Sequence, residues 1–159
     1  MKKKFFIGLF VFAAIGLFVF AHIVLKHNVP SYQPQQNLQA PIEIPSKSII
    51  SYKEAENIDK PMVLMFYVDW CGYCRKYMPV FAKFADLYKD KYSFVAVNCD
   101  NSDNIKLVEK FHIMAFPSLF IFDKKINHRF TLNMAVTNEE SVMKEELDNY
   151  ITVRKNILK

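Results

Sequence analysis

The chain has 159 residues and a hydrophobic content of 52%, enough for one domain with a buried core plus a targeting segment, and a second domain is not expected. Its formal net charge is +5, but four of the 21 lysines and arginines stand in the first 27 residues, which contain no acidic residue: Lys2, Lys3, Lys4 and Lys26. The rest of the chain balances 17 basic against 16 acidic groups without a basic run. We therefore expect no nucleic-acid partner.

An uncharged stretch of 21 residues, Phe5 to Leu25, follows the first three lysines. A helix of that length, at about 1.5 Å per residue, crosses a hydrocarbon core of about 30 Å. Because the lysines cluster before it, we expect residues 1–27 to be a single-pass membrane anchor with the later chain on the extracytoplasmic, periplasmic side. The alternative is a cleaved signal peptide, since Val19-Phe20-Ala21 has the small-residue pattern of a cleavage site. Both alternatives predict export.

Residues 28–47 alternate prolines with glutamines and contain little that could form a core. Proline fixes φ, and polar residues bury little area, so we expect a Pro/Gln-rich linker that is extended or disordered. The third predicted part is a domain over residues 48–159.

Within this domain the hydrophobic pattern changes repeatedly between helical and strand periods. The expected elements, in chain order, begin with a helix over 51–59, a strand over 62–68, a helix over 74–89 and a strand over 92–98. A short helix over 102–111, strands over 118–123 and 126–132, and a last helix over 137–154 follow. Ser51 and Thr137 each begin a capping-box pattern. Strands separated by helices imply parallel pairing, and the last hairpin adds an antiparallel edge, so the fold class is α/β.

Cys71 and Cys74 stand where the strand over 62–68 gives way to the next helix. A thiolate at a helix N-terminus faces unpaired backbone N–H groups and the positive end of the helix dipole, which lower its pKa. We therefore expect Cys71 to be the attacking group. Cys74 lies one turn into the helix and is expected to resolve the mixed disulfide.

The spacing of these two cysteines alone leaves other sites open. Zinc needs four ligands, and the other candidates are scattered: Cys99, His22, His27, His112 and His128. Haem attachment needs histidine directly after the second cysteine, where Arg75 stands. Soft thiolates also select copper(I), so copper delivery or metalloprotein assembly remains the alternative function. We otherwise expect no metal and no cofactor beyond the thiols themselves.

The run Trp70-Cys71-Gly72-Tyr73-Cys74, followed five residues later by Pro79, resembles the thioredoxin family, as does Phe116-Pro117-Ser118 before a strand. The resemblance covers about residues 48–153. It implies a thioredoxin fold, a central mixed sheet flanked by helices, preceded here by the transmembrane helix. It also implies a cis Pro117 against the cysteine pair, a bend at Pro79, and substrate binding by Trp70, Phe116 and Pro117.

Three positions depart from this family. Six residues before the first cysteine, thioredoxins carry a buried aspartate that moves protons to and from the second thiol, but this chain has Met65, and the partner lysine is replaced by Ala96. Proton transfer is then expected to use water or substrate groups, or rapid reduction to be poorer. Tyr73 replaces the commoner proline, is similar to the residue in periplasmic disulfide isomerases, and should make the disulfide somewhat more oxidising.

These features together predict a membrane-tethered thiol–disulfide oxidoreductase, a reductase or interchange enzyme acting on disulfides of exported proteins. Oxidase and isomerase roles are near alternatives, and a reductase needs a membrane thiol electron donor. Of the remaining residues, Cys99 is expected to be half-buried and structural, and His112 to lie on the surface or at a helix end. Asp69 and Arg75 either tune the cysteines or are solvated. Asn133 is a candidate for positive φ, because Gly72 is the only glycine after the anchor.

The anchor predicts that the mature protein keeps residues 1–25 and fractionates with membranes. Mass spectrometry of the purified native protein measures its N-terminus. An N-terminus at His22 would contradict the anchor, while export would still stand.

Overall fold

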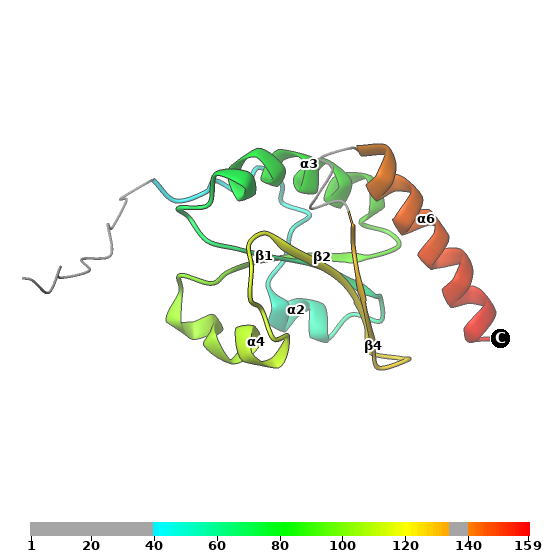
Figure 1. Cartoon of the computed structure of the whole chain (residues 1–159). Coiled ribbons are helices and arrows are strands. Elements are labelled where there is room, and N and C mark those ends of the chain that lie inside the picture. The colour runs from blue at the N-terminus through cyan, green and yellow to red at the C-terminus, as the bar shows by residue number, and fades with distance from the viewer. Residues whose placement is uncertain (1–39, 134–139) are drawn as a thin grey trace, which may run out of the picture. The chain divides into compact units, whose positions relative to one another are not determined.

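The computed structural model describes residues 40–133 and 140–159 (Figure 1). Its elements are α2 (Tyr52–Glu56), β1 (Met62–Tyr67), α3 (Gly72–Tyr88), β2 (Ser93–Asn98), the 3₁₀ helix η1 (Ser102–Asn104), α4 (Ile105–Lys110), β3 (Ser118–Asp123), β4 (His128–Thr131) and α6 (Glu140–Ile157). None of the helices in these two ranges combines the length and apolarity needed to cross a membrane. The predicted anchor, most of the predicted linker and the predicted cap Thr137 lie outside the described residues.

The four strands form one mixed sheet in the order β2-β1-β3-β4. β1 pairs in parallel with β2 and antiparallel with β3, and β3 pairs antiparallel with β4. Figure 1 shows α3 on one face of the sheet and α2 and α4 on the other. The predicted α/β fold, with a mixed sheet flanked by helices, is confirmed.

β1 is buried at all six positions because each face of the strand meets an apolar cluster. Met65 contributes to the cluster that also holds Phe81 of α3 and Leu147 of α6. Phe66 contributes to the opposite cluster, where its ring centroid lies 5.3 Å from that of Phe111. The strand is therefore the central element between the two helical layers.

α3 begins at Gly72, two residues before the predicted start, because Cys71 serves as its N-cap. The Cys71 sulfur accepts a hydrogen bond from the Cys74 backbone N–H at 3.1 Å, which satisfies one of the free amides at the helix start. Pro79 lies inside the helix, as predicted.

Positive φ occurs at His112 (49°) and Asn127 (46°) in the described ranges, so the prediction for Asn133 is wrong. Asn127 ends the turn between β3 and β4, and His112 follows the C-cap of α4, where its N–H bonds to the Glu109 carbonyl at 3.1 Å. Asn133 is instead held by the Glu146 carboxylate, which accepts from its backbone and side-chain nitrogens at 2.9 and 3.0 Å.

Residues 40–47, the last part of the predicted linker, pack on the domain. The Ile42 side chain is buried in the same cluster as α3, and the Ser46 hydroxyl donates to the Asp86 carboxylate at 2.6 Å. The sequence did not predict this packing, because two buried side chains among many exposed ones give no period.

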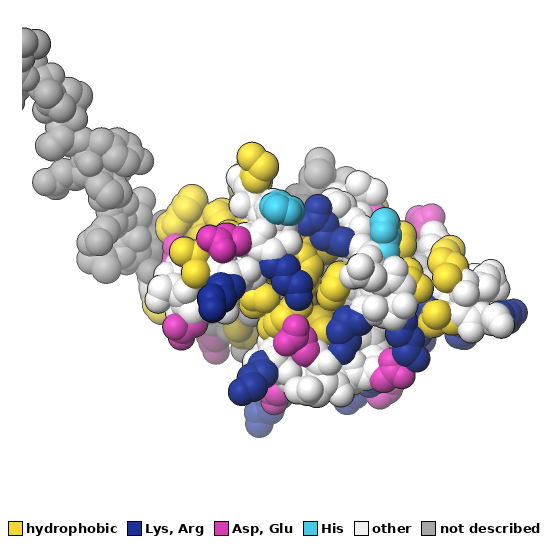
Figure 2. All heavy atoms as spheres, turned by 90° about the horizontal axis from the view of Figure 1, so that it is seen from below, with side chains coloured by type: hydrophobic (Ala, Val, Ile, Leu, Met, Phe, Trp, Pro, Cys, Tyr) yellow, Lys and Arg dark blue, Asp and Glu magenta, His cyan; other side chains and the backbone are white. Residues whose placement is uncertain are grey.

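The surface over α2 and α4 mixes basic and acidic side chains around small apolar areas, as Figure 2 shows for that face. Lys110 lies over the rings of Tyr52 and Phe111 at 5.2 and 5.6 Å from their centroids. Its ammonium group thus lies over aromatic ring faces, where the negative charge of the π system attracts it.

α6 is fastened to the end of β3 by a buried carboxylate. Asp123, 1% exposed, accepts hydrogen bonds from the Tyr150 hydroxyl at 2.8 Å and from Arg154 Nε at 2.5 Å. Burial alone would raise the pKa of Asp123, but the hydrogen bonds from Arg154, Tyr150 and the Lys125 amide outweigh it and lower the pKa below the ordinary aspartate value.

Arg154→Met should lower the free energy of unfolding at neutral pH by about 3 kcal/mol, because the Asp123 charge stays buried without its partner. A lowered native pKa stabilises the fold above the unfolded-state pKa of about 4, and this stabilisation is lost as the pH falls. The deficit of the variant, measured by urea unfolding, should therefore shrink below about pH 4. Lys155→Met, at an exposed neighbouring position, is the control. Equal losses in both variants would contradict the assigned role of the ion pair.

Candidate active site

Cys71 and Cys74 lie at the junction of β1 and α3 and form a disulfide with a Cα–Cα distance of 5.2 Å. Cys71 is 7% exposed and caps the helix, whereas Cys74 is fully buried in the first turn. Both cysteines belong to the cluster between the sheet and α3. The pair is thus asymmetric: both residues are buried, but Cys71 caps the helix and keeps a small exposed fraction, whereas Cys74 keeps none.

The loop before β3 lies at the same end of the sheet as the cysteine pair. Phe116-Pro117 is a cis peptide, as the resemblance implies, and Ser118 pairs with Phe66 near the end of β1. The ring of Phe116 meets that of Trp70 edge-to-face at 6.2 Å between centroids. The structure therefore brings together predicted site residues that are more than 40 positions apart in the chain.

The surface around these two loops carries exposed apolar side chains. Trp70 is 57% exposed, Tyr73 69% and Met114 95%. Met114 was not among the predicted site residues, although a long apolar side chain just before the Phe116-Pro117 pair was a usable signal. A surface of this kind favours contact with a peptide over contact with a small polar molecule.

Met65 and Ala96, which replace the polar pair of the family, are register partners on β1 and β2. Met65 is fully buried in the cluster that contains Cys74, and Ala96 packs against that cluster. Neither position can donate or accept a proton. Deprotonation of Cys74 is therefore opposed by an apolar surrounding.

Asp69 and Arg75, which flank the cysteines, are both hydrogen-bonded. The Asp69 carboxylate accepts from the Ile42 backbone N–H at 2.8 Å and from Asn98 Nδ2 at 2.9 Å. Arg75 donates to the Asp69 carbonyl at 2.6 Å and to the Ala40 carbonyl. The alternative of two merely solvated charges is wrong.

Cys99 and His112 take no part in the disulfide, although Cys99 packs against the apolar cluster that contains Cys71 and Cys74. Cys99 is half-buried at the end of β2, where burial raises the pKa of its thiol to about 11. His112 is exposed at the end of α4, as expected. Across the described ranges no three potential metal-ligating side chains gather at one place.

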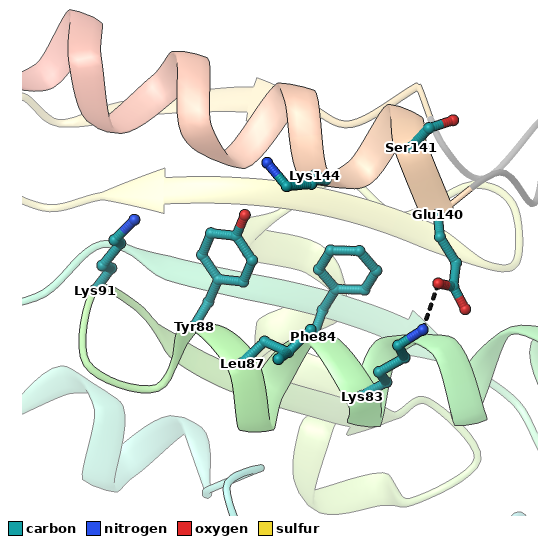
Figure 3. Close-up of a pocket in the computed structure, with 8 residues that line it drawn as sticks. All are labelled: Lys83, Phe84, Leu87, Tyr88, Lys91, Glu140, Ser141 and Lys144. Atoms are coloured by element: carbon teal, nitrogen blue, oxygen red, sulfur yellow. Dashed lines mark hydrogen bonds and ion pairs between the residues drawn. The ribbon is translucent and has the colours of Figure 1, made fainter.

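A groove of about 460 Å³ between α3 and α6 is separate from the cysteine pair (Figure 3). Phe84, Leu87 and Tyr88 form its apolar wall, and Lys83 and Glu140 face each other across one end at 2.5 Å. Lys83 stands about 18 Å along the helix from Cys71, so the groove takes no part in disulfide chemistry.

Comparison with known proteins decides the family. A family model described as Thioredoxin matches residues 48–151. The chain belongs to the thioredoxin family. The predicted resemblance is thereby confirmed, and Cys71 and Cys74 are the CXXC pair of this thioredoxin domain.

Individual relatives match parts of the thioredoxin domain. The chain is 36% identical over 80 residues to the thioredoxin-like protein HCF164, chloroplastic, of Arabidopsis thaliana. This match covers 50% of this chain and 31% of that protein. It is 35% identical over 72 residues to a thioredoxin of Alicyclobacillus acidocaldarius, covering 45% of this chain and 67% of that one. The fold is similar to that of the J-Trx1 fragment of ERdj5, with a TM-score of 0.57 and 22% identity over 67% of this chain and 51% of that one. The match thus spans under a third of the chloroplast relative's length.

Cys99→Ser should leave disulfide reduction nearly unchanged, because the raised pKa keeps this thiol protonated near neutral pH and because the disulfide joins Cys71 to Cys74. In the reduced parent chain, iodoacetamide at pH 7 should label Cys71 before Cys99, as mass spectrometry of their peptides would measure. A variant that lost most of its activity would place Cys99 in the redox cycle.

Proposed function

We propose that this chain is a thiol–disulfide oxidoreductase that acts on disulfides of exported proteins through Cys71 and Cys74. The observation that carries the proposal is the position of the Cys71 sulfur at the N-cap of α3, 3.1 Å from the Cys74 backbone nitrogen. A helix of 17 residues directs its free amides and the positive end of its dipole toward this sulfur. These groups stabilise the Cys71 thiolate, which is the reactive form.

The proposed reaction has two exchange steps. In the first, the Cys71 thiolate attacks one sulfur of a substrate disulfide, and a mixed disulfide forms as one substrate thiolate leaves. In the second, deprotonated Cys74 attacks the Cys71 sulfur, and the other substrate thiolate leaves. Two electrons pass to the substrate, its thiolates take up the protons of the two cysteines, and the chain ends in the Cys71–Cys74 disulfide. The reverse sequence oxidises a substrate dithiol.

Protein substrates are favoured by the apolar surface beside the pair. Trp70, Phe116 and Pro117 come from two loops at the same sheet end, and exposed Met114 widens this surface. An extended peptide with apolar side chains could cover these residues and place its disulfide at Cys71.

The surroundings of Cys74 bear on the rate of the second step. The buried Met65 offers no proton acceptor, so the second step depends on hydroxide, water or a substrate thiolate as the base. This supports an interchange enzyme or a slow reductase. A reductase cycle needs an electron donor, and the apolar stretch at 5–25 supports a thiol donor in the membrane and a tethered domain on its extracytoplasmic side.

Cys74→Ser in the full chain should accumulate mixed disulfides with exported proteins, because Cys71 can still attack but nothing resolves the product. Cys71→Ser should accumulate almost none, and Cys99→Ser is the matched control for loss of one thiol. Non-reducing gels and mass spectrometry of the trapped partners measure the outcome. Adducts on Cys71→Ser in place of Cys74→Ser would reverse the assigned roles, and adducts on neither variant would contradict the proposed function.

A further inference from the structure

Residues 40–46, here called the strap, are bound to both side chains that flank the cysteine pair. The Ile42 backbone N–H donates to Asp69 Oδ1 at 2.8 Å, and Arg75 donates to the Ala40 carbonyl. In Figure 1 the strap begins, in cyan, beside the loop that joins β1 to α3. The backbone of the strap therefore supplies polar groups to the edge of the active site.

The strap is fixed along its length as well as at its start. The Ile42 side chain is buried in the cluster that contains Cys71 and Cys74. Further along, Ser46 donates to Asp86 at 2.6 Å and accepts from the Ser48 backbone N–H at 3.0 Å. The Ile42 amide is thus held in place by packing on one side and by side-chain hydrogen bonds on the other.

Besides the Ile42 amide, three other groups form hydrogen bonds with Asp69. Its carboxylate also accepts from Asn98 Nδ2 at 2.9 Å, its backbone N–H donates to Asp100 Oδ2 at 2.7 Å, and Arg75 holds its carbonyl. Among the described residues, Tyr67, Cys99 and Asp100 are further titratable groups at this sheet end, and Arg75 supplies a positive charge beside Asp69. The Ile42 amide is the donor that the strap contributes to the carboxylate.

Asp69 stands two residues before Cys71, so their Cα atoms are within about 7 Å. A carboxylate near a thiol opposes its ionisation, and donors bound to the carboxylate reduce this effect. Hydrogen bonds from N–H groups to a carboxylate are stronger than neutral ones, so the loss of one donor changes the local field.

We propose that Ile42 and Asp69 are positioning residues of the active site: the strap amide holds the Asp69 carboxylate and offsets its charge, which makes Cys71 ionise more readily. The strap then contributes a hydrogen-bond donor to the site, in addition to leading the chain into the domain. This inference rests on the proposed role of Cys71 as the attacking thiol.

The test compares five full-length chains in the reduced state: the parent, Ile42→Pro, Ile42→Ala, Asp69→Asn and the double variant with Ile42→Pro and Asp69→Asn. Proline removes the amide hydrogen. Alanine keeps the hydrogen and removes more of the buried side chain, so it is the matched control. Alkylation of Cys71 by iodoacetamide, followed by mass spectrometry over about pH 4 to 10, gives the pH midpoint of the thiolate.

Ile42→Pro should raise this midpoint by about half a unit or more, Ile42→Ala should leave it unchanged, and Asp69→Asn should lower it. In the Asp69→Asn background, Ile42→Pro should have no further effect, because the charge that it exposes is gone. Equal shifts in the proline and alanine variants would assign the effect to packing and overturn the proposal, as would additive shifts in the double variant. If Ile42→Pro does not fold, an unchanged midpoint in Asp69→Asn overturns it.

The proposed function fails separately from this inference. Preferential alkylation of Cys74 in the parent chain would contradict the role of Cys71, whatever the variants do. Preferential alkylation of Cys71 without the predicted shifts would contradict the strap alone.

Discussion

Every residue of β1 is buried, so this strand must have a paired neighbour on each side and an apolar layer on each face. Its parallel neighbour β2 can be reached only through a crossover, and that crossover is α3. A crossover helix begins at the carboxyl end of the strand before it, which is where Cys71 stands. The antiparallel neighbour β3 begins at the same end, because Ser118 pairs with Phe66, and this brings Pro117 there as well. The active site is thus a consequence of how β1 is buried.

Features carried by strong local patterns could be predicted from the sequence. The bounds of β3 agree with the prediction because an apolar run follows Pro117 and ends at Asp123, and α3 has a clear helical period. Features decided by a single distant contact could not. Asn133 has the chemistry for positive φ, but the Glu146 carboxylate holds it in another conformation, while His112 adopts positive φ because the end of α4 needs that geometry. Side-chain type alone does not reveal which of these residues the tertiary structure selects.

The replacement of a polar pair by Met65 and Ala96 favours apolar packing of the core and removes a proton acceptor from the surroundings of Cys74. In register on β1 and β2, the two residues complete an apolar cluster under α3 without a buried charge that would need a partner. The same cluster encloses Cys74 and offers its thiol no base. Stability and proton transfer therefore make opposite demands on this position, and the sequence of this chain favours packing.

The strap lies beside Cys71, the other member of the cysteine pair, and there too packing and the chemistry of a thiol depend on the same residues. A proline-containing segment loses less conformational entropy on ordering than a freely flexible one, so a few contacts suffice to hold it. Here the contacts are the buried Ile42 side chain and the hydrogen bonds to Asp69 and Asp86. Because Asp69 follows β1, binds Asn98 at the end of β2 and accepts from Arg75 of α3 through its carbonyl, the strap, both parallel strands and the start of α3 meet around this one residue. In the proposed role, Asp69 links the strap to the cysteine two residues away, which a segment bound at another edge of the sheet would not do.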